Sequence, residues 1–441
     1  MAQCQCPALL IAAPASGQGK TTLTAALARY HRNQGRRVRV FKTGPDFIDP
    51  MVLQAASGYP VYNLDLWIVG EQRCRQLLAD AAQKADLILI EGVMGLFDGT
   101  PSSADLAEKF NIPALVLVDA GAMAQSFGAI ALGLASYRPG LDIFGLIANR
   151  VAGPRHHQML EESIPKPIRF IGSLPRENGI ILPERHLGIV QGMEIADLEQ
   201  RLERAAQLIE QQGLTELPPP TDFDRPAENT YSPLLRGQTI AVARDTAFAF
   251  VYQDNLNLLK DLGAELRFFS PLQDTCLPPA DSLYLPGGYP ELHAEQLGSN
   301  HAMLNAVRDH HSQGKPIVAE CGGMMYLAEQ IVTKERKRWP MAGILPGEAV
   351  MQTSLAGIGS QYARFGSGTL RGHTFHYSLL HTSLSSALST RRHPGGDPGR
   401  ETGEAVYRQG NLTASYVHWY FDSDPSVCAA LFLPSESTPD A

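Results

Sequence analysis

The stretch Pro316-Ile317-Val318-Ala319-Glu320-Cys321-Gly322-Gly323-Met324 gives the strongest indication of the fold. A short apolar run ends at a single cysteine, two glycines follow, and an apolar helical pattern resumes at Met324, Met325 and Leu327. This order predicts a sharp strand-to-helix turn that exposes the cysteine beside small neighbours. We therefore expect an α/β fold in which Cys321 is a nucleophile. The alternative is a buried, inert thiol.

A second motif lies near the N-terminus, where the apolar run Ala8–Ala13 leads into the stretch Pro14-Ala15-Ser16-Gly17-Gln18-Gly19-Lys20-Thr21-Thr22. Small residues let backbone N–H groups wrap phosphate oxygens, a lysine balances phosphate charge, and a hydroxyl can bind Mg²⁺. The stretch predicts a nucleotide-binding phosphate loop, although Pro14 stands where the usual pattern has glycine. The alternative is a glycine-rich turn with a chance Gly-Lys-Thr. The expected binding residues are Ser16, Gly17, Gln18, Gly19, Lys20, Thr21 and Thr22.

Carboxylates follow two further strand-like runs. Asp46 and Asp49 come after Val38–Lys42, whereas Glu91 directly follows Leu87–Ile90 and precedes Asp98. Ligands bind at the carboxyl ends of strands in open α/β sheets, and Mg²⁺ prefers oxygen ligands.

We therefore predict Thr21, Asp46 and Glu91 as metal ligands, with Asp49 and Asp98 positioning metal or substrate. Solvated turn aspartates and a strand-end cap are the alternatives. Asn149, which follows the run Phe144–Ala148, could read an adenine edge or tie down its own backbone.

Length and composition indicate a globular protein of two domains. The chain has 441 residues, of which 44% are hydrophobic and 19% charged. Lys and Arg number 37 and Asp and Glu 45, so the net charge is −8, and with no basic run we expect neither nucleic acid nor an anionic membrane as partner. Six sparse cysteines without paired metal spacing favour a reduced, cytoplasmic protein. The run Ala8–Ala13 is too short for a signal peptide or a membrane helix.

The apolar runs divide the chain into two α/β halves. Residues 1–215 alternate buried-strand runs with helical segments such as Thr21–Gln34, which predicts a doubly wound domain with a parallel sheet. Residues 216–236 are proline-rich and predict a linker. A second domain over 237–435 begins with the run Thr239–Ala243, and residues 391–403 predict a surface loop.

In the second half, a thiolate that attacks an amide needs a base and backbone donors for the oxyanion. His418, at the end of an apolar run, is the candidate base, and a satisfied structural histidine is the alternative. Gly288 and Gly322 are the candidate oxyanion residues. His373 and His376 lie in a strand-like segment, so we expect packing or a domain interface rather than a metal site.

Together these motifs resemble the cobyrinate or hydrogenobyrinate a,c-diamide synthases of corrinoid biosynthesis over nearly the whole chain. The resemblance rests on Ala-Pro-Ala-Ser-Gly-Gln-Gly-Lys-Thr-Thr (13–22), Lys-Thr-Gly-Pro-Asp-Phe-Ile-Asp-Pro (42–50), Glu-Gly-Val-Met-Gly-Leu-Phe-Asp-Gly (91–99), Pro-Gly-Gly-Tyr-Pro-Glu (286–291) and Ala-Glu-Cys-Gly-Gly-Met-Met-Tyr-Leu (319–327). It implies an N-terminal P-loop domain of the dethiobiotin synthetase type and a C-terminal class I glutamine amidotransferase domain. In this branch a proline at position 14 is usual.

The resemblance further implies that Cys321 and His418 hydrolyse L-glutamine and that MgATP activates side-chain carboxylates of cobyrinic or hydrogenobyrinic acid. A homodimer is one option. Amidation of nickel-sirohydrochlorin, a cobyric acid synthase, and a P-loop regulator with a dead glutaminase are the alternatives. Two positions depart from the family: Thr374 stands where glutamate is common, and Tyr420 stands where many glutaminases have an acid.

Overall fold

The computed structural model describes residues 3–185, 188–189, 191–227, 229–366, 368–393 and 403–434. The chain divides into two compact units, Met1–Glu228 and Asn229–Ala441. Among the described residues, none of the helices combines the length and the hydrophobicity needed to span a bilayer.

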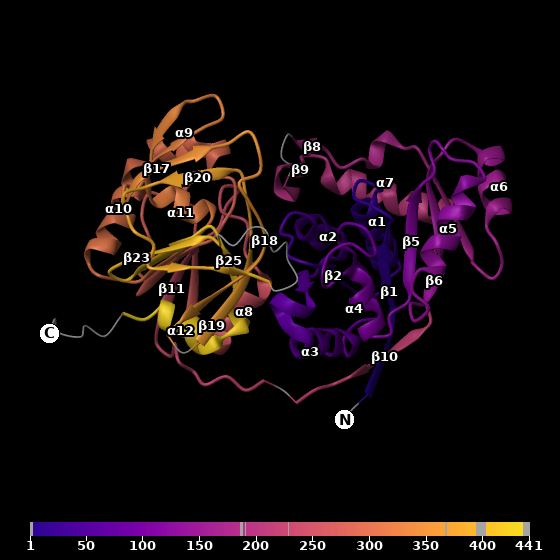
Figure 1. The fold of residues 1–441 in the computed structure, drawn as a ribbon, viewed down its shortest axis with the longest axis horizontal. Coiled ribbons are helices and arrows are strands. Elements are labelled where there is room, and N and C mark those ends of the chain that lie inside the picture. Colours follow the sequence, from indigo (N-terminus) through magenta and orange to yellow (C-terminus); the bar gives the residue numbers. More distant parts are fainter. Residues whose placement is uncertain are drawn as a thin grey trace. The chain divides into compact units, whose positions relative to one another are not determined.

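The first unit is built on a sheet with the strand order β3-β2-β4-β1-β5-β6-β7, all of them parallel (Figure 1). Its elements are β1 (Gln3–Ala12), α1 (Lys20–Asn33), β2 (Val38–Thr43), α2 (Asp49–Ser57), β3 (Tyr62–Leu64), α3 (Glu71–Ala82), β4 (Leu87–Glu91), α4 (Ser103–Lys109), β5 (Ala114–Asp119), α5 (Ser126–Ser136), β6 (Ile143–Val151), α6 (Pro154–Ser163), β7 (Phe170–Pro175), β8 (Glu184–Arg185), β9 (Gly188–Ile189), α7 (Leu198–Gln211) and β10 (Pro220–Asp224). The four runs named above as strand-like, Ala8–Ala13, Val38–Lys42, Leu87–Ile90 and Phe144–Ala148, are confirmed in β1, β2, β4 and β6.

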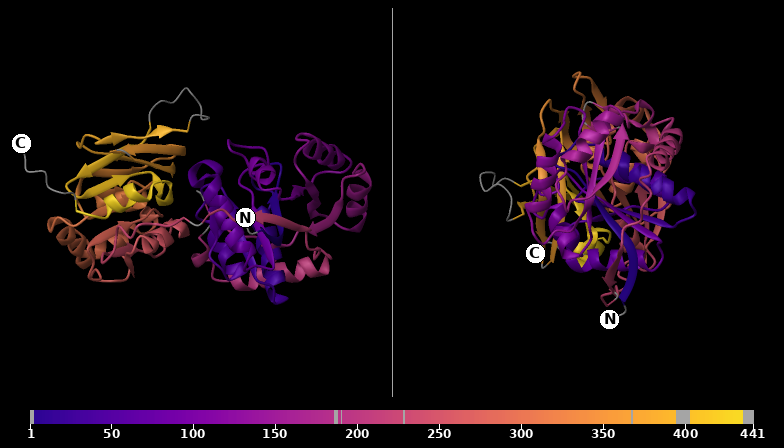
Figure 2. Two further views of the ribbon diagram at one scale, coloured as in Figure 1. Left: turned by 90° about the horizontal axis from the view of Figure 1, so that it is seen from below. Right: turned by 90° about the vertical axis from the view of Figure 1, so that its right-hand side faces the viewer.

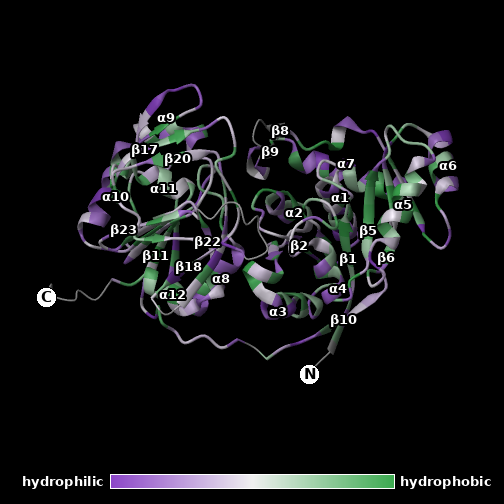
Figure 3. Cartoon of the chain, in the orientation of Figure 1, coloured by the Kyte–Doolittle hydropathy of each residue, from purple (hydrophilic) through white to green (hydrophobic). Residues whose placement is uncertain are grey.

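The central strands of this sheet are apolar because helices cover both of their faces. Every residue of β4 is buried, and its alternate residues Leu87 and Leu89 pack with Leu9 and Ile11 of β1 in one core cluster. Figures 1 and 2 show the helices around the strands, and Figure 3 shows central strands such as β1 and β5 largely in the hydrophobic colour. The carboxyl ends of β1, β2 and β4 therefore carry the loops that follow them at one edge of the sheet.

The predicted linker 216–236 is wrong over part of its length. Pro220–Asp224 forms β10, which pairs antiparallel with β1 from Gln3↔Asp224 to Pro7↔Pro220. Prolines at the first position of an edge strand are tolerated because no ladder donor is lost there. The boundary between the units consequently lies after Glu228.

The second unit has a sheet of order β12-β11-β13-β14-β24-β23-β21 and two four-stranded sheets, β16-β15-β17-β20 and β22-β18-β19-β25. Its elements are β11 (Thr239–Ala243), α8 (Gln253–Asp261), β12 (Glu265–Phe269), β13 (Ser282–Leu285), α9 (Ala294–Ser299), α10 (His301–Ser312), β14 (Ile317–Glu320), α11 (Gly322–Leu327), β15 (Ala328–Val332), β16 (Arg338–Pro340), β17 (Leu345–Met351), β18 (Gly357–Phe365), β19 (Gly368–His376), β20 (Ser378–His381), β21 (Leu388–Ser389), β22 (Arg391–Arg392), β23 (Ala405–Gln409), β24 (Leu412–Ser415), β25 (His418–Tyr420) and α12 (Pro425–Leu431).

The predicted surface loop 391–403 is wrong at its start, where Arg391–Arg392 form strand β22 against β18. Residues 394–402 of that prediction lie outside the described residues. The predicted strand-turn-helix at Cys321 is confirmed, because β14 ends at Glu320 and α11 begins at Gly322.

Candidate active sites

The phosphate loop joins β1 to the first turn of α1. Gly17 and Gly19 have φ angles of 76° and 99°, in the left-handed region that glycine adopts readily. The Lys20 Nζ donates to the carbonyl oxygens of Ala15 at 3.2 Å and Met94 at 2.6 Å. Burial and the neighbouring Lys42 ammonium lower the pKa of Lys20. A cation and the N-terminus of a helix thus face the same space, which suits a phosphate group.

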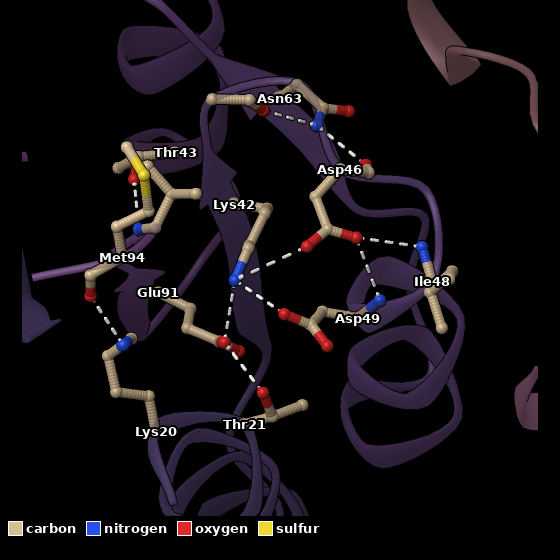
Figure 4. Close-up of polar contacts among 12 residues, drawn as sticks. Lys20, Thr21, Lys42, Thr43, Asp46, Ile48, Asp49, Asn63, Glu91 and Met94 are labelled. Atoms are coloured by element: carbon tan, nitrogen blue, oxygen red, sulfur yellow. Dashed lines mark hydrogen bonds and ion pairs between the residues drawn. The ribbon is translucent and has the colours of Figure 1, made fainter. Parts of the chain in front are cut away.

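A buried lysine, Lys42, lies among the carboxylates that follow β2 or end β4 (Figure 4). The Lys42 Nζ lies 2.6 Å from Asp49 Oδ2, 2.7 Å from Glu91 Oε1 and 3.8 Å from Asp46 Oδ2. The side chains of Lys42 and Glu91 are 3% and 1% exposed, so solvent screens this cluster little. Lys42 was not predicted as a site residue. The signal that could have found it is a lysine near the end of a largely buried strand, next to two carboxylates.

The electrostatics of this cluster depend on Lys42. Burial alone would lower the pKa of Lys42, but the carboxylates of Glu91, Asp49 and Asp46 together raise it above its ordinary value. Burial and the charge of Asp49 raise the pKa of Asp46 to about 7. Burial raises the pKa of Glu91 to about 8, whereas the Lys42 ammonium outweighs burial at Asp49 and lowers its pKa. The site can therefore hold a proton or a second cation.

Thr21 and Glu91 form the pair that fits Mg²⁺ best. The Thr21 hydroxyl donates to Glu91 Oε1 at 2.8 Å, and Glu91 Oε2 is buried with no hydrogen-bond partner among the described residues. Hydroxyl and carboxylate oxygens are ligands that Mg²⁺ prefers. Asp46 Oδ1 instead accepts the N–H groups of Ile48 at 2.8 Å and Asp49 at 3.1 Å. Within the described part of the chain, no three carboxylate, imidazole or thiol groups are arranged to hold a metal by themselves.

Three predicted residues support the loops around the site. Asn149 Nδ2 donates to the Gln18 carbonyl at 2.7 Å, and its Oδ1 accepts from the Arg150 N–H at 2.9 Å. These contacts fit a backbone-tying amide, and the adenine-reading role of Asn149 stays a prediction. The Gln18 side chain accepts from the N–H of Asp119 at 2.7 Å, and Asp98 Oδ2 accepts from that of Gly95 at 2.9 Å.

A cavity of about 740 Å³ opens beside these groups. Phosphate-loop residues, Lys42, Asp46, Asp49, Glu91 and Asn149 line it, whereas Gln18 and Asp98 are not in its lining. Its remaining wall includes Leu174–Asn178 and Ile180–Leu182, which follow β7 or end it. These residues were not predicted to line a site, because their sequence contains no recognisable motif.

In the second unit, Cys321 occupies a strained turn. Its φ is 45° and ψ −107°, a conformation rare for a residue with a side chain. The Cys321 N–H donates to the Ser415 carbonyl at 2.8 Å, which fixes the turn to β24. Burial raises the pKa of the Cys321 thiol above its ordinary range, so the thiol needs a base to take its proton.

His418 and the two oxyanion candidates meet around the glycine pair after β13. A Cβ on Gly287 would lie 2.1 Å from His418 Cε1, and one on Gly322 would lie 2.9 Å from the Gly288 nitrogen. Only glycine at 287 leaves room for the imidazole. Burial lowers the pKa of His418 well below its ordinary value, so the ring is neutral and able to accept a proton.

A buried carboxylate ties the strand of His418 to the nucleophile turn. Glu320 Oε1 accepts the Trp419 N–H at 3.1 Å, and Oε2 accepts the Tyr284 hydroxyl at 2.9 Å. His373 lies opposite His418 in the β19–β25 pairing, and their rings stack with centroids 5.1 Å apart. Neither Glu320 nor His373 was predicted as a site residue.

Thr374 and Tyr420, the two positions at which this chain differs from the family pattern, each donate to a carboxylate from another part of the chain. The hydroxyl of Tyr420 donates to Asp254 on α8. The Thr374 hydroxyl donates to Glu404 Oε1 at 3.1 Å, and the same oxygen lies 3.0 Å from His376 Nε2. His373 and His376 thus have separate partners, as expected for packing rather than shared metal binding.

Comparisons with known proteins agree with these two sites. The nucleotide binding domain of the CobQ/CobB/MinD/ParA type matches residues 9–189, and the CobB/CobQ-like glutamine amidotransferase domain matches residues 239–426. Both the resemblance and the predicted pairing of two α/β domains are confirmed.

Full-length relatives narrow the family further. A hydrogenobyrinate a,c-diamide synthase of Stutzerimonas stutzeri is 57% identical, covering 97% of this chain and 99% of the relative. One of Pseudomonas aeruginosa is 55% identical, covering 99% of each chain. A cobyrinate a,c-diamide synthase of Herminiimonas arsenicoxydans is 51% identical, covering 97% of this chain and 96% of the relative. The chain therefore belongs to the family of the hydrogenobyrinate and cobyrinate a,c-diamide synthases.

Proposed function

We propose that this protein amidates the a and c side-chain carboxylates of hydrogenobyrinic acid, using ATP and glutamine. The observation that carries the proposal is the identity of 57% and 55%, over almost the whole chain, to two relatives named for this reaction. Cobyrinic acid is the second candidate, because a relative named for it is 51% identical.

In the second unit, His418 would take the Cys321 proton and the thiolate would attack the glutamine side-chain amide. The N–H groups of Gly288 and Gly322 would bind the oxyanion. Ammonia leaves, and water hydrolyses the resulting thioester to glutamate. The position of the His418 ring against Gly287, beside the oxyanion candidates, supports its role as base.

In the first unit, a corrin carboxylate would accept the γ-phosphoryl group of ATP. The resulting acyl phosphate is a good electrophile, and ammonia would displace phosphate from it to leave an amide. Lys20 and the N–H groups of residues 16–22 would bind the phosphates of the nucleotide. Thr21 and Glu91 would hold Mg²⁺, which supplies charge stabilisation when bound. Asp46 and Asp49 would act through Lys42, which suits positioning of the corrin carboxylate better than direct metal binding.

A Cys321→Ser variant tests this division of labour. We expect it to lose glutamine-dependent amidation and to keep amidation with ammonium ion, because the first unit needs only ammonia. A variant inactive with both nitrogen sources would contradict independent sites. Running hydrogenobyrinic and cobyrinic acid as competing substrates with the wild-type protein decides between the two corrins.

Two properties of the protein remain proposals. We expect a cytoplasmic location, because all six cysteines are free thiols. A homodimer is one option for the assembly, and light scattering tests it.

A further inference from the structure

A second cavity, of about 380 Å³, lies in the second unit and takes no part in the steps above. Its wall includes His376 at the end of β19, Arg392 of β22, Glu404 just before β23, and Tyr416 just after β24. The first three are charged or titratable groups from different parts of the chain. Such convergence of polar groups in a concave space is typical of small-molecule sites.

The acidic side of this cavity is held in place. Glu404 Oε1 interacts with Thr374 Oγ1 at 3.1 Å and with His376 Nε2 at 3.0 Å, and the Glu404 side chain is 17% exposed. Its Oε2 has no hydrogen bond to the described residues. One carboxylate oxygen is therefore fixed and the other is available to a donor from a ligand.

The basic side of the cavity is Arg392, which has no counter-ion among the residues that the structure describes. Arg392 Nε is buried and makes no hydrogen bond among the described residues, and its guanidinium forms no ion pair with them. Arg391, its neighbour on β22, is exposed. The Arg392 guanidinium lines the cavity, and a carboxylate is the group that its fork of donors fits best.

The cavity adjoins the nucleophile turn through Tyr416. The Tyr416 ring stacks on His376 with centroids 3.8 Å apart, and Ser378 Oγ donates to the Tyr416 hydroxyl at 2.9 Å. Ser378 Oγ also lies 3.3 Å from the sulfur of Met325 on α11. The residue before Tyr416, Ser415, accepts the Cys321 N–H. The Glu404 charge is among the influences that raise the pKa of the Cys321 thiol, after burial and Glu291.

We propose that this cavity binds the amino-acid head of glutamine, with Glu404 receiving the α-ammonium group and Arg392 the α-carboxylate. The side-chain amide of the ligand then extends toward Cys321. This inference rests on the proposed glutaminase function. It adds how that site distinguishes a free amino acid from other primary amides.

The test compares glutamate release by wild-type protein with that of Glu404→Gln and Arg392→Ala, using Arg391→Ala as the matched control. Loss of one charge-assisted contact should raise KM for glutamine about 10- to 100-fold with kcat nearly unchanged. Two truncated amides assign the roles. Glu404→Gln should not weaken hydrolysis of glutaramic acid, which lacks the ammonium group. Arg392→Ala should not weaken that of 4-aminobutanamide, which lacks the carboxylate.

Two further measurements separate binding from folding and from the corrin chemistry. The rate at which iodoacetamide alkylates Cys321 should stay the same in Arg392→Ala and Arg391→Ala, because this reagent has no amino-acid head. In Glu404→Gln the rate should not fall, because loss of the nearby negative charge favours the thiolate. Amidation of the corrin with ammonium ion should also be unchanged, and its failure in wild-type protein would count against the proposed corrin reaction instead. Unchanged KM values for glutamine, or equal losses with all three amides, would overturn the inference.

Discussion

Replacing Lys42 with methionine should destabilise the first unit strongly. The substitution keeps the length of the side chain but removes the cation that lies 2.6 Å from Asp49 and 2.7 Å from Glu91. At an effective dielectric constant of about 20, one pair at such a distance contributes about 6 kcal/mol before desolvation is subtracted. Breaking a buried pair by removing one partner costs about 3–5 kcal/mol, because the other charge stays buried and uncompensated.

The assay is unfolding in urea, with hydrogen exchange as the readout. Peptides from β2 and β4 report on the first unit alone. The matched control is Arg37→Met, which removes an ion pair of similar length, 2.8 Å, with Asp86. The side chains of Arg37 and Asp86 are 57% and 41% exposed. Arg37→Met should lower the free energy of unfolding by only a small fraction of what Lys42→Met does, because water screens the exposed pair.

The pH dependence gives a second check on the same variant. Burial, with the charge of Asp49, raises the pKa of Asp46 to about 7 even beside Lys42, and without Lys42 the carboxyl pKa values should rise further. Between pH 8 and pH 5 the folded variant then binds protons that the unfolded chain does not, so part of the lost stability should return as pH falls. Added Mg²⁺ should also restore part of the stability that Lys42→Met loses. A loss no larger than that of Arg37→Met would refute the reasoning.

Three other substitutions test the sites. Gly287→Ala should abolish glutamine hydrolysis but spare ammonium-dependent amidation, because the added methyl occupies the space of the His418 ring; retained glutaminase activity would contradict this. Glu320→Ala should lower kcat for glutamine about 10- to 100-fold with little change in KM, because it removes the acceptor of the Trp419 N–H next to His418; a change in KM alone would argue against positioning. Asn149→Ala should weaken ATP and GTP hydrolysis equally, because its amide holds the Gln18 carbonyl; a selective loss with ATP would restore the adenine-reading role.

The sequence predicted the parts of the fold that depend on local patterns. Apolar runs between glycine-rich turns identified the parallel strands, since strands buried on both faces carry few polar residues. The phosphate loop and the cysteine turn could be located because their chemistry requires small residues next to one reactive side chain. The resemblance then joined both motifs to one function.

Features that depend on long-range contacts could not be predicted in this way. Strand β10 begins at the last of three consecutive prolines, a sequence typical of a linker, and only its pairing with β1 makes it a strand. Lys42 gains its role from carboxylates on other elements. Glu404 lies 30 positions from Thr374 in the sequence, so no local spacing links the two.

The most direct test of the proposed function measures the products of one reaction. Purified protein is incubated with MgATP, glutamine and hydrogenobyrinic acid, and phosphate, glutamate and the corrin mass are followed together. We predict equal amounts of phosphate and glutamate, both dependent on the corrin, and a corrin mass that corresponds to two carboxylate-to-amide conversions. Glutamate release without phosphate release or a change in corrin mass, with cobyrinic acid equally inert, would contradict the proposed function.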